Sequence, residues 1–234
     1  MACYGVRRKA WMILRIGAAV WLLGGGLGVA RAAEKETRVF NIKIDDKPAG
    51  YHQMTISRPD DRTITLDSRA DVSVSYLIKK YKYTYRGTER WIDGRLIQLM
   101  SETNDDGTQY QVLVQADGDK LRVRVNGTEH TTRQDVWTTT YWQLPQLQSP
   151  NQAVALLDCD TGKDLRGTLR YVGMEPLLVG GQTQNCAHYQ IRELHVDVWY
   201  DAQKRLVRQA SLDDGHRVLL ELARIDRQAL LPKP

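Results

Sequence analysis

The feature that most limits the fold of this chain is a repeated alternation of apolar and polar residues. Alternation with a period of two places successive side chains on opposite faces of a β-strand. It recurs in segments 39–44, 63–66, 72–76, 121–125 and 195–199. Asp-Gly and Asn-Gly pairs punctuate these segments, and such pairs are typical of hairpin turns because they tolerate positive φ. The connections are too short to hold crossover helices, so the sheet should be mainly antiparallel.

We therefore expect an all-β fold, with a single curved, mainly antiparallel sheet or partial barrel of about 11 to 14 strands. One or two short helices are expected near residues 137–157. Ser149 is a suitable N-cap for a helix that starts at Pro150 and ends at Leu157, although residues 153–157 also fit a buried strand. The segment 137–147 fits either a loop or a short helix.

Two segments about 108 residues apart share a sequence pattern. Trp91 and Trp199 are each followed by an Asp, by Arg-Leu and then by an Asp-Gly turn. Each segment is predicted to be a three-stranded meander, with the tryptophan in the first strand and an exposed turn after it. The rules of antiparallel folds explain this repetition better than an ancestral duplication does.

The first 32 residues have the composition of a cleavable secretory signal peptide. Basic residues precede an apolar run from Ile16 to Ala30, and the run ends in the small-x-small triplet Ala30-Arg31-Ala32. The apolar run is shorter than the ~20 residues that a membrane span needs. We therefore expect residues 1–32 to be removed and residues 33–234 to form a single β-rich domain, periplasmic or secreted and without a transmembrane span. An uncleaved N-terminal anchor is the alternative.

The basic charge of the chain belongs to this N-terminal segment. The chain has 33 Lys+Arg and 28 Asp+Glu. Five of the basic residues and none of the acidic ones lie in the first 32 positions, so 28 of each remain after cleavage. A neutral domain lacks the clustered excess of Lys and Arg that nucleic-acid binding requires, and we expect no nucleic-acid partner.

Several motifs together resemble an uncharacterised family of exported bacterial proteins, a domain of unknown function. They are Trp91-Ile92-Asp93-Gly94-Arg95-Leu96, Tyr141-Trp142, Leu156-Leu157-Asp158-Cys159-Asp160-Thr161-Gly162-Lys163, Ala187-His188-Tyr189 and Val198-Trp199-Tyr200-Asp201. The resemblance covers most of the chain after residue 32, and it implies no known chemistry. The layout is also similar, in architecture only, to the curved sheets of Lol-type periplasmic lipoprotein carriers.

The sequence contains no familiar catalytic or cofactor-binding motif, and we predict neither a catalytic residue nor a cofactor. There is no nucleophile elbow, phosphate loop or dinucleotide-binding fingerprint. The histidines lack the spacing of a metal site. The acids Asp93, Asp106, Asp201 and Asp214 could form a carboxylate pair, but each lies in a turn signal, where Asp usually caps its own backbone.

Two cysteines remain after the predicted cleavage, Cys159 and Cys186. An oxidising export compartment favours a disulfide between them. Two alternatives are a pair of free buried thiols and a functional site in which Cys186 and His188 share one face of a strand.

The aromatic residues give the only candidate ligand site. Tyr81, Tyr83 and Tyr85 alternate with polar residues and should share one face of a strand. The candidate ligand-binding residues are Tyr81, Tyr83, Tyr85, Trp91, Trp142 and Trp199. The same side chains could instead fill the core of a domain that has a single phenylalanine.

Two functions fit these features. The first is a non-catalytic periplasmic binder or carrier of an apolar or amphipathic ligand such as a lipid, held on the concave face of the sheet. The second is a structural or protein-interaction module of the cell envelope, with an unknown protein partner. A cavity lined by aromatic residues favours the first, and a packed interior with an exposed apolar patch favours the second.

Overall fold

The alternating segments form strands in which one face is dry. Along β1 (Glu34–Ile44), the side chains of Phe40, Ile42 and Ile44 are buried, whereas Asn41 between them is exposed. The computed structural model describes residues 34–229 except 77–78, 147 and 150. The predicted signal peptide therefore lies outside the described residues.

The described residues form fifteen strands and one short 3₁₀ helix. The first eight strands are β1 (Glu34–Ile44), β2 (Lys47–Arg58), β3 (Thr63–Tyr76), β4 (Lys79–Ile92), β5 (Arg95–Asp105), β6 (Thr108–Asp117), β7 (Lys120–Val125) and β8 (Thr128–Arg133). The others are β9 (Trp137–Thr138), β10 (Asn151–Leu157), β11 (Asp164–Val179), β12 (Gln182–Ile191), β13 (Val196–Tyr200), β14 (Leu206–Asp213) and β15 (His216–Ala229), with the 3₁₀ helix η1 (Arg192–Leu194) before β13.

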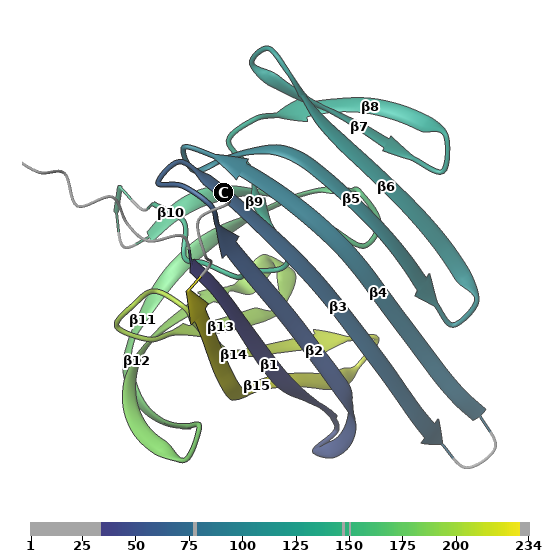
Figure 1. The fold of residues 1–234 in the computed structure, drawn as a ribbon. Coiled ribbons are helices and arrows are strands. Elements are labelled where there is room, and N and C mark those ends of the chain that lie inside the picture. Colours follow the sequence, from purple (N-terminus) through teal and green to yellow (C-terminus); the bar gives the residue numbers. More distant parts are fainter. Residues whose placement is uncertain (1–33, 77–78, 147, 150, 230–234) are drawn as a thin grey trace, which may run out of the picture. The chain divides into compact units, whose positions relative to one another are not determined.

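All fifteen strands belong to one sheet. Its order is β8-β7-β6-β5-β4-β3-β2-β1-β15-β14-β13-β12-β11-β10-β9, so β1 at the centre joins two meanders (Figure 1). Neighbouring strands are antiparallel except β9 and β10, which are parallel. The all-β class and the curved, mainly antiparallel sheet are confirmed. The number of strands exceeds the expected 11 to 14, because β9 is very short and β10 takes the place of an expected helix.

The two ends of the sheet are brought near each other by the chain itself. Strand β8 is one edge and β9 is the other, and only residues 134–136 connect them. Four peptide units span at most about 15 Å, so the edges approach each other at this point. The sheet is therefore strongly curled, but within the described residues it does not close into a barrel.

The helix expected from Pro150 to Leu157 is wrong. Residues Asn151–Leu157 form β10, which pairs with β11 along its whole length and with β9 at Leu156 and Leu157. Val154 and Leu156 are buried, with the partly buried Ala155 between them. This alternation was obscured in the sequence by alanine, which also favours helices. Between β9 and β10, the described residues contain no helix either, so residues 139–146 and 148–149 are irregular.

The two tryptophan motifs are confirmed as parts of meanders. Trp91 is the second-last residue of β4 and Trp199 is the second-last residue of β13. A β-bulge interrupts the register with the following strand at each motif, between Arg90 and Trp91 and between Trp199 and Tyr200. The exposed turn after Trp91 is confirmed at Asp93 and Gly94. The turn after Trp199 is exposed at residues 202–204, and only its first residue, Asp201, is buried, where it accepts hydrogen bonds from Arg205.

Candidate functional site

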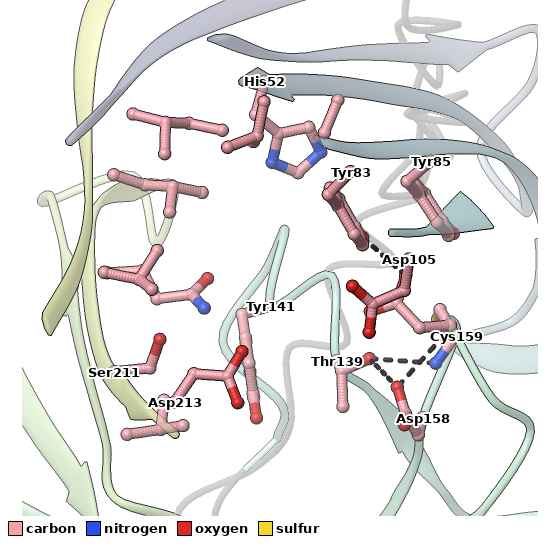
Figure 2. A pocket seen from close by; sticks show the side chains of 18 of the residues that line it. His52, Tyr83, Tyr85, Asp105, Thr139, Tyr141, Asp158, Cys159, Ser211 and Asp213 are labelled. Atoms are coloured by element: carbon pink, nitrogen blue, oxygen red, sulfur yellow. Dashed lines mark hydrogen bonds between the residues drawn. The ribbon is translucent and has the colours of Figure 1, made fainter. Parts of the chain in front are cut away.

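The concave face of the curled sheet lines a partly open cavity of about 670 Å³. Strands β1 to β5 line it on one side and strands β11 and β13 to β15 line it on the other. The irregular segment 139–141 and the turn after β10 complete the wall (Figure 2). The volume falls within the range of ~300 to 1,000 Å³ that is typical of small-molecule sites.

One part of the wall is apolar because it continues the dry faces of the central strands. Its side chains come from both halves of the sheet, which meet at β1 and β15. They are Ile42, Ile44, Ala70, Val72, Leu165, Leu194, Val196, Val218 and Leu220. An alkyl chain or ring against this wall would gain the free energy of leaving water.

The remaining part of the wall carries hydroxyl and carboxyl groups. Its aromatic members are Tyr81, Tyr83, Tyr85 and Tyr141, and its acids are Asp105, Asp158, Asp160, Asp213 and Asp214. The other polar members include Thr139, Thr140, Gln209, Ser211, His52 and His216. The cavity thus offers an apolar surface and a polar surface to the same occupant.

Tyr83 and Asp160 form the polar contact at the centre of this wall. The Tyr83 hydroxyl donates to Oδ1 of Asp160 at 2.6 Å, and the Thr103 hydroxyl donates to the same oxygen at 3.3 Å. Burial and the neighbouring Asp158 raise the pKa of Asp160 to about 7. At neutral pH this carboxyl group can therefore act as either a hydrogen-bond donor or an acceptor toward a ligand.

The turn that presents Asp160 is built by its own sequence. Asp158 accepts hydrogen bonds from the backbone N–H of Asp160 at 3.1 Å and from the hydroxyl of Thr161 at 2.6 Å. Gly162 follows with φ of +70°, and a Cβ there would lie 2.4 Å from Val125 on β7. The residues of this turn are thus fixed by Asx chemistry and by a close approach that only glycine allows.

A buried carboxylate anchors the irregular segment beside the cavity. Glu89 on β4 accepts hydrogen bonds from the Trp91 indole at 2.8 Å, from Thr138 at 3.0 Å and from Thr140 at 2.8 Å. These donors are neutral, and burial raises the pKa of Glu89 to about 7. Because an irregular segment leaves polar groups without sheet partners, such side-chain bonds hold it in place.

A second anchor satisfies the backbone of the same segment. The buried Arg38 donates to the carbonyl oxygen of Trp142 at 2.6 Å and to Oε1 of Glu36 at 2.7 Å. The Tyr200 hydroxyl donates to the carbonyl oxygen of Tyr141 at 2.9 Å. Tyr141 adopts a left-handed conformation with φ of +48°, which is uncommon for a residue with a Cβ. These contacts hold Tyr141 at the cavity despite its unfavourable backbone.

The six predicted ligand-binding residues divide into two groups. Tyr81, Tyr83 and Tyr85 do lie on one face of β4 and line the cavity. The three tryptophans do not line it. Trp91 and Trp142 are buried against each other, with ring centroids 6.2 Å apart, and Trp199 stacks on His188 at 4.3 Å. The tryptophans are therefore placed to pack the protein rather than to contact an occupant of this cavity.

The expected disulfide between Cys159 and Cys186 is absent, and both cysteines are buried free thiols. Cys159 lines the cavity, with its Sγ 3.8 Å from Oε1 of Glu89. Cys186 lies in β12 opposite Glu175, and its Sγ is 3.6 Å from the carbonyl oxygen of Gln184. The two cysteines are held in different surroundings by different strands, which their sequence positions do not reveal. Burial raises the pKa of the Cys159 thiol, so the thiolate is disfavoured.

The five aspartates that line the cavity were not predicted as ligand-binding residues. The turn interpretation holds for Asp106 and Asp214, whose φ angles are +46° and +45°. The residues just before these turns, Asp105 and Asp213, face the cavity, which the turn interpretation did not predict. Their signal was a second acidic residue directly before each Asp-Gly pair.

Among the described residues, no group of three or more His, Cys, Asp or Glu side chains could hold a metal ion. Burial lowers the pKa of His52 to about 4, so this cavity residue is neutral at neutral pH, and its ring lies 2.7 Å from the Ser68 hydroxyl. The part of the chain that the structure describes has no helix long and apolar enough to cross a membrane.

Comparisons with known proteins agree with the fold. The model of a family described as "Domain of unknown function (DUF6134)" matches residues 40–223. A search of curated proteins found no match to this sequence. Among solved structures, the chain is similar to a β-barrel-like protein from Brucella abortus that contains a domain of unknown function, DUF1849. That match has a TM-score of 0.61 and 8% identity, and it covers 85% of this chain and 99% of the other.

Proposed function

This chain belongs to the DUF6134 family of domains of unknown function, and we propose that it is a non-catalytic binder or carrier of an apolar or amphipathic small molecule. The observation that carries the proposal is the cavity of about 670 Å³, with an apolar wall on one side and tyrosine and aspartate side chains on the other. Small-molecule sites commonly combine apolar surface with placed polar groups that fix the orientation of the ligand.

The buried polar contacts around the cavity support this proposal. Tyr83, Thr103 and Asp160 form a hydrogen-bonded group at the wall. The hydroxyl of Tyr85 is buried without a hydrogen-bond partner among the described residues. A buried hydroxyl without a partner costs free energy, and a ligand in the cavity would be a source of the missing bond.

Export is part of the same proposal. The sequence of residues 1–32 predicts that the protein acts outside the cytoplasm, in the periplasm or as a secreted protein. A non-catalytic carrier in that compartment would shield an apolar molecule from water while it moves between membranes.

The alternative, a protein-interaction module, is favoured by a separate feature. Four large apolar side chains of β11 are exposed on the surface: Tyr171, Val172, Met174 and Leu178. Where exposed apolar side chains form a contiguous patch, they often mark a contact with another protein. This surface and the cavity are made by different residues, so one experiment can distinguish the two functions.

The test is a fluorescence titration of the purified protein with fatty-acyl and phospholipid probes. We expect saturable binding at micromolar concentrations, and loss of that binding in an Ala70→Trp variant, because Ala70 lines the cavity and the larger ring would fill it. Ser73→Trp is the matched control, since Ser73 is exposed on the opposite face of the same strand. Absence of saturable binding, or equal binding by both variants, would leave the interaction module as the better account.

A further inference from the structure

The charged side chains of the cavity wall are almost all acidic. Five aspartates line it, Asp105, Asp158, Asp160, Asp213 and Asp214, and within the described residues no lysine or arginine does. Two histidines also line the wall, and the charge of one of them, His216, acts to lower the pKa of Asp213, but the acids outnumber them. Burial keeps His52 neutral, and His216 lies 2.7 Å from a further acid, Asp45.

Two of these acids approach from different parts of the sheet. Asp105 ends β5 and Asp213 ends β14, and Figure 2 shows them on different sides of the cavity. Burial, with the negative charges of Asp214 and Asp105, raises the pKa of Asp213 above its usual value. The two carboxylates thus face the same cavity from different strands, and a positive charge between them would be attracted by both.

Aromatic rings lie beside the same carboxylates. The Tyr81 hydroxyl donates to Oδ1 of Asp105 at 2.8 Å, and Tyr83 donates to Asp160 at 2.6 Å. Tyrosine faces attract organic cations, and carboxylates nearby strengthen that attraction. The acids are not grouped tightly enough to bind a metal ion, since the described residues contain no such group of three. A larger cation suits the spacing better than a compact one.

A second and independent feature points to a ligand at this site. Tyr85 lines the cavity and is only 4% exposed. Its hydroxyl has no hydrogen-bond partner in the described part of the protein. Figure 2 shows the ring next to Tyr83, directed toward the polar wall. Buried hydroxyl groups in native proteins are nearly always hydrogen-bonded, so the polar wall carries an unmet hydrogen-bonding group at this position.

We propose that the ligand carries an organic cation, an ammonium group attached to an apolar chain. This inference rests on the proposed function, because it assigns chemistry to the polar end of the same ligand. The cation lies between Asp105 and Asp213 against the ring of Tyr81, and the chain lies along the apolar wall around Val72 and Leu220.

The test compares three probes that share one alkyl chain: decyltrimethylammonium, decanol and decanoate. Each is titrated calorimetrically into the purified protein below the concentration at which it forms micelles. We expect the cation to bind most tightly and the anion least, with about five- to tenfold between cation and alcohol. Raising the salt concentration should weaken the binding of the cation and leave the binding of the alcohol unchanged.

Two variants test which residues cause the preference for the cation. The double variant Asp105→Asn with Asp213→Asn should lose the preference for the cation and bind decanol as the native protein does. Both residues are exposed at the ends of strands, so the variant should fold. Asp119→Asn, in the exposed turn between β6 and β7, removes one charge far from the cavity wall and should change nothing.

The outcomes separate this inference from the proposed function. Equal binding of all three probes, tightest binding of decanoate, or an unchanged preference in the double variant overturns the cationic ligand and leaves a binder of apolar molecules. If none of the probes binds, and fatty-acyl and phospholipid probes also fail, the proposed function falls as well.

Discussion

At the scale of residues, the inner face of β4 decides both stability and binding. Tyr81, Tyr83 and Tyr85 line the cavity from this face, and Glu89 and Trp91 continue it into the buried end. Their polar groups differ in hydrogen bonding. Among the described residues, the Tyr83 hydroxyl and the Glu89 carboxylate have partners, whereas the Tyr85 hydroxyl has none. Substitutions that remove one polar group at a time therefore give opposite effects at neighbouring positions.

Tyr85→Phe should stabilise the ligand-free protein. The Tyr85 hydroxyl is buried without a partner within the described residues, so removing it should raise the free energy of unfolding by about 1 kcal/mol. Tyr83→Phe is the control, because it removes the donor to Asp160 and should lower that free energy by about 1 kcal/mol. Urea unfolding of both variants measures the difference, and a loss of stability in Tyr85→Phe would contradict the assignment.

Glu89→Gln should change how stability depends on pH. Burial raises the pKa of Glu89 from 4.5 to about 7, so the folded protein binds this proton more tightly than the unfolded chain. The stabilisation from the proton is complete below pH 4.5 and is lost as the pH rises to about 7, a change of up to about 3 kcal/mol. Glutamine keeps an acceptor for Trp91 and does not titrate.

Unfolding measured at several pH values tests this prediction. Relative to the native protein, the Glu89→Gln variant should become more stable between pH 5 and pH 8. A difference that stays constant over that interval would show that Glu89 does not titrate there. Comparing the two proteins at each pH removes the contributions of the other titrating groups, Asp160 included.

At the scale of elements, the turn between β10 and β11 fixes the polar wall. It carries Asp158, Cys159 and Asp160 into the cavity wall, and Gly162 packs against β7 where a side chain would not fit. The contacts of this turn with β5, which include the bond from the Ser101 hydroxyl to the carbonyl oxygen of Cys159 at 2.5 Å, tie the two halves of the sheet together.

Gly162→Ala should destabilise the protein more than Gly127→Ala. Both glycines have positive φ, at +70° and +89°, so each substitution carries a backbone cost of about 1 kcal/mol. Only at Gly162 would the new Cβ meet neighbouring atoms, and this overpacking should add about 1 to 3 kcal/mol. Thermal unfolding of the two variants gives the comparison, and equal losses would mean that the turn moves to make room.

The elements that could be predicted from the sequence were those with clean alternation and explicit turn residues. The tyrosines of β4 and the two tryptophan motifs are examples, because their spacing alone places them on strands. Strand β10 could not be distinguished from a helix, since its burial depends on pairing with β9 and β11. The burial of Trp91 and Trp142 against each other, and the separation of Cys159 from Cys186, depend on contacts that span many residues.

At the scale of the whole molecule, the curled sheet turns two meanders into a container. The short connection between β8 and β9 brings the edges near each other, and the buried side chains of Trp137, Trp142 and Leu144 fill the buried end. The cavity is what remains at the other end, near the turns that follow β5 and β14. The same curling could have produced a solid core, so the cavity could not be predicted from the strand pattern.

Export of the whole molecule can be checked directly. The small residues at positions 30 and 32 predict that the protein isolated outside the cytoplasm begins at Ala33. N-terminal sequencing or intact mass measurement decides the point. Recovery of the chain with residues 1–32 in the membrane fraction would instead support an uncleaved anchor.

The central claim is that the cavity holds an amphipathic molecule, and one measurement tests it most directly. Crystals of the protein grown with 12-bromododecylamine would reveal the bromine by its anomalous scattering. The account predicts a bromine site inside the cavity, against the apolar wall formed by Val72 and Leu220, with the amine near Asp105 and Asp213. Bromine sites confined to the outer surface, around the exposed side chains of β11, would contradict it.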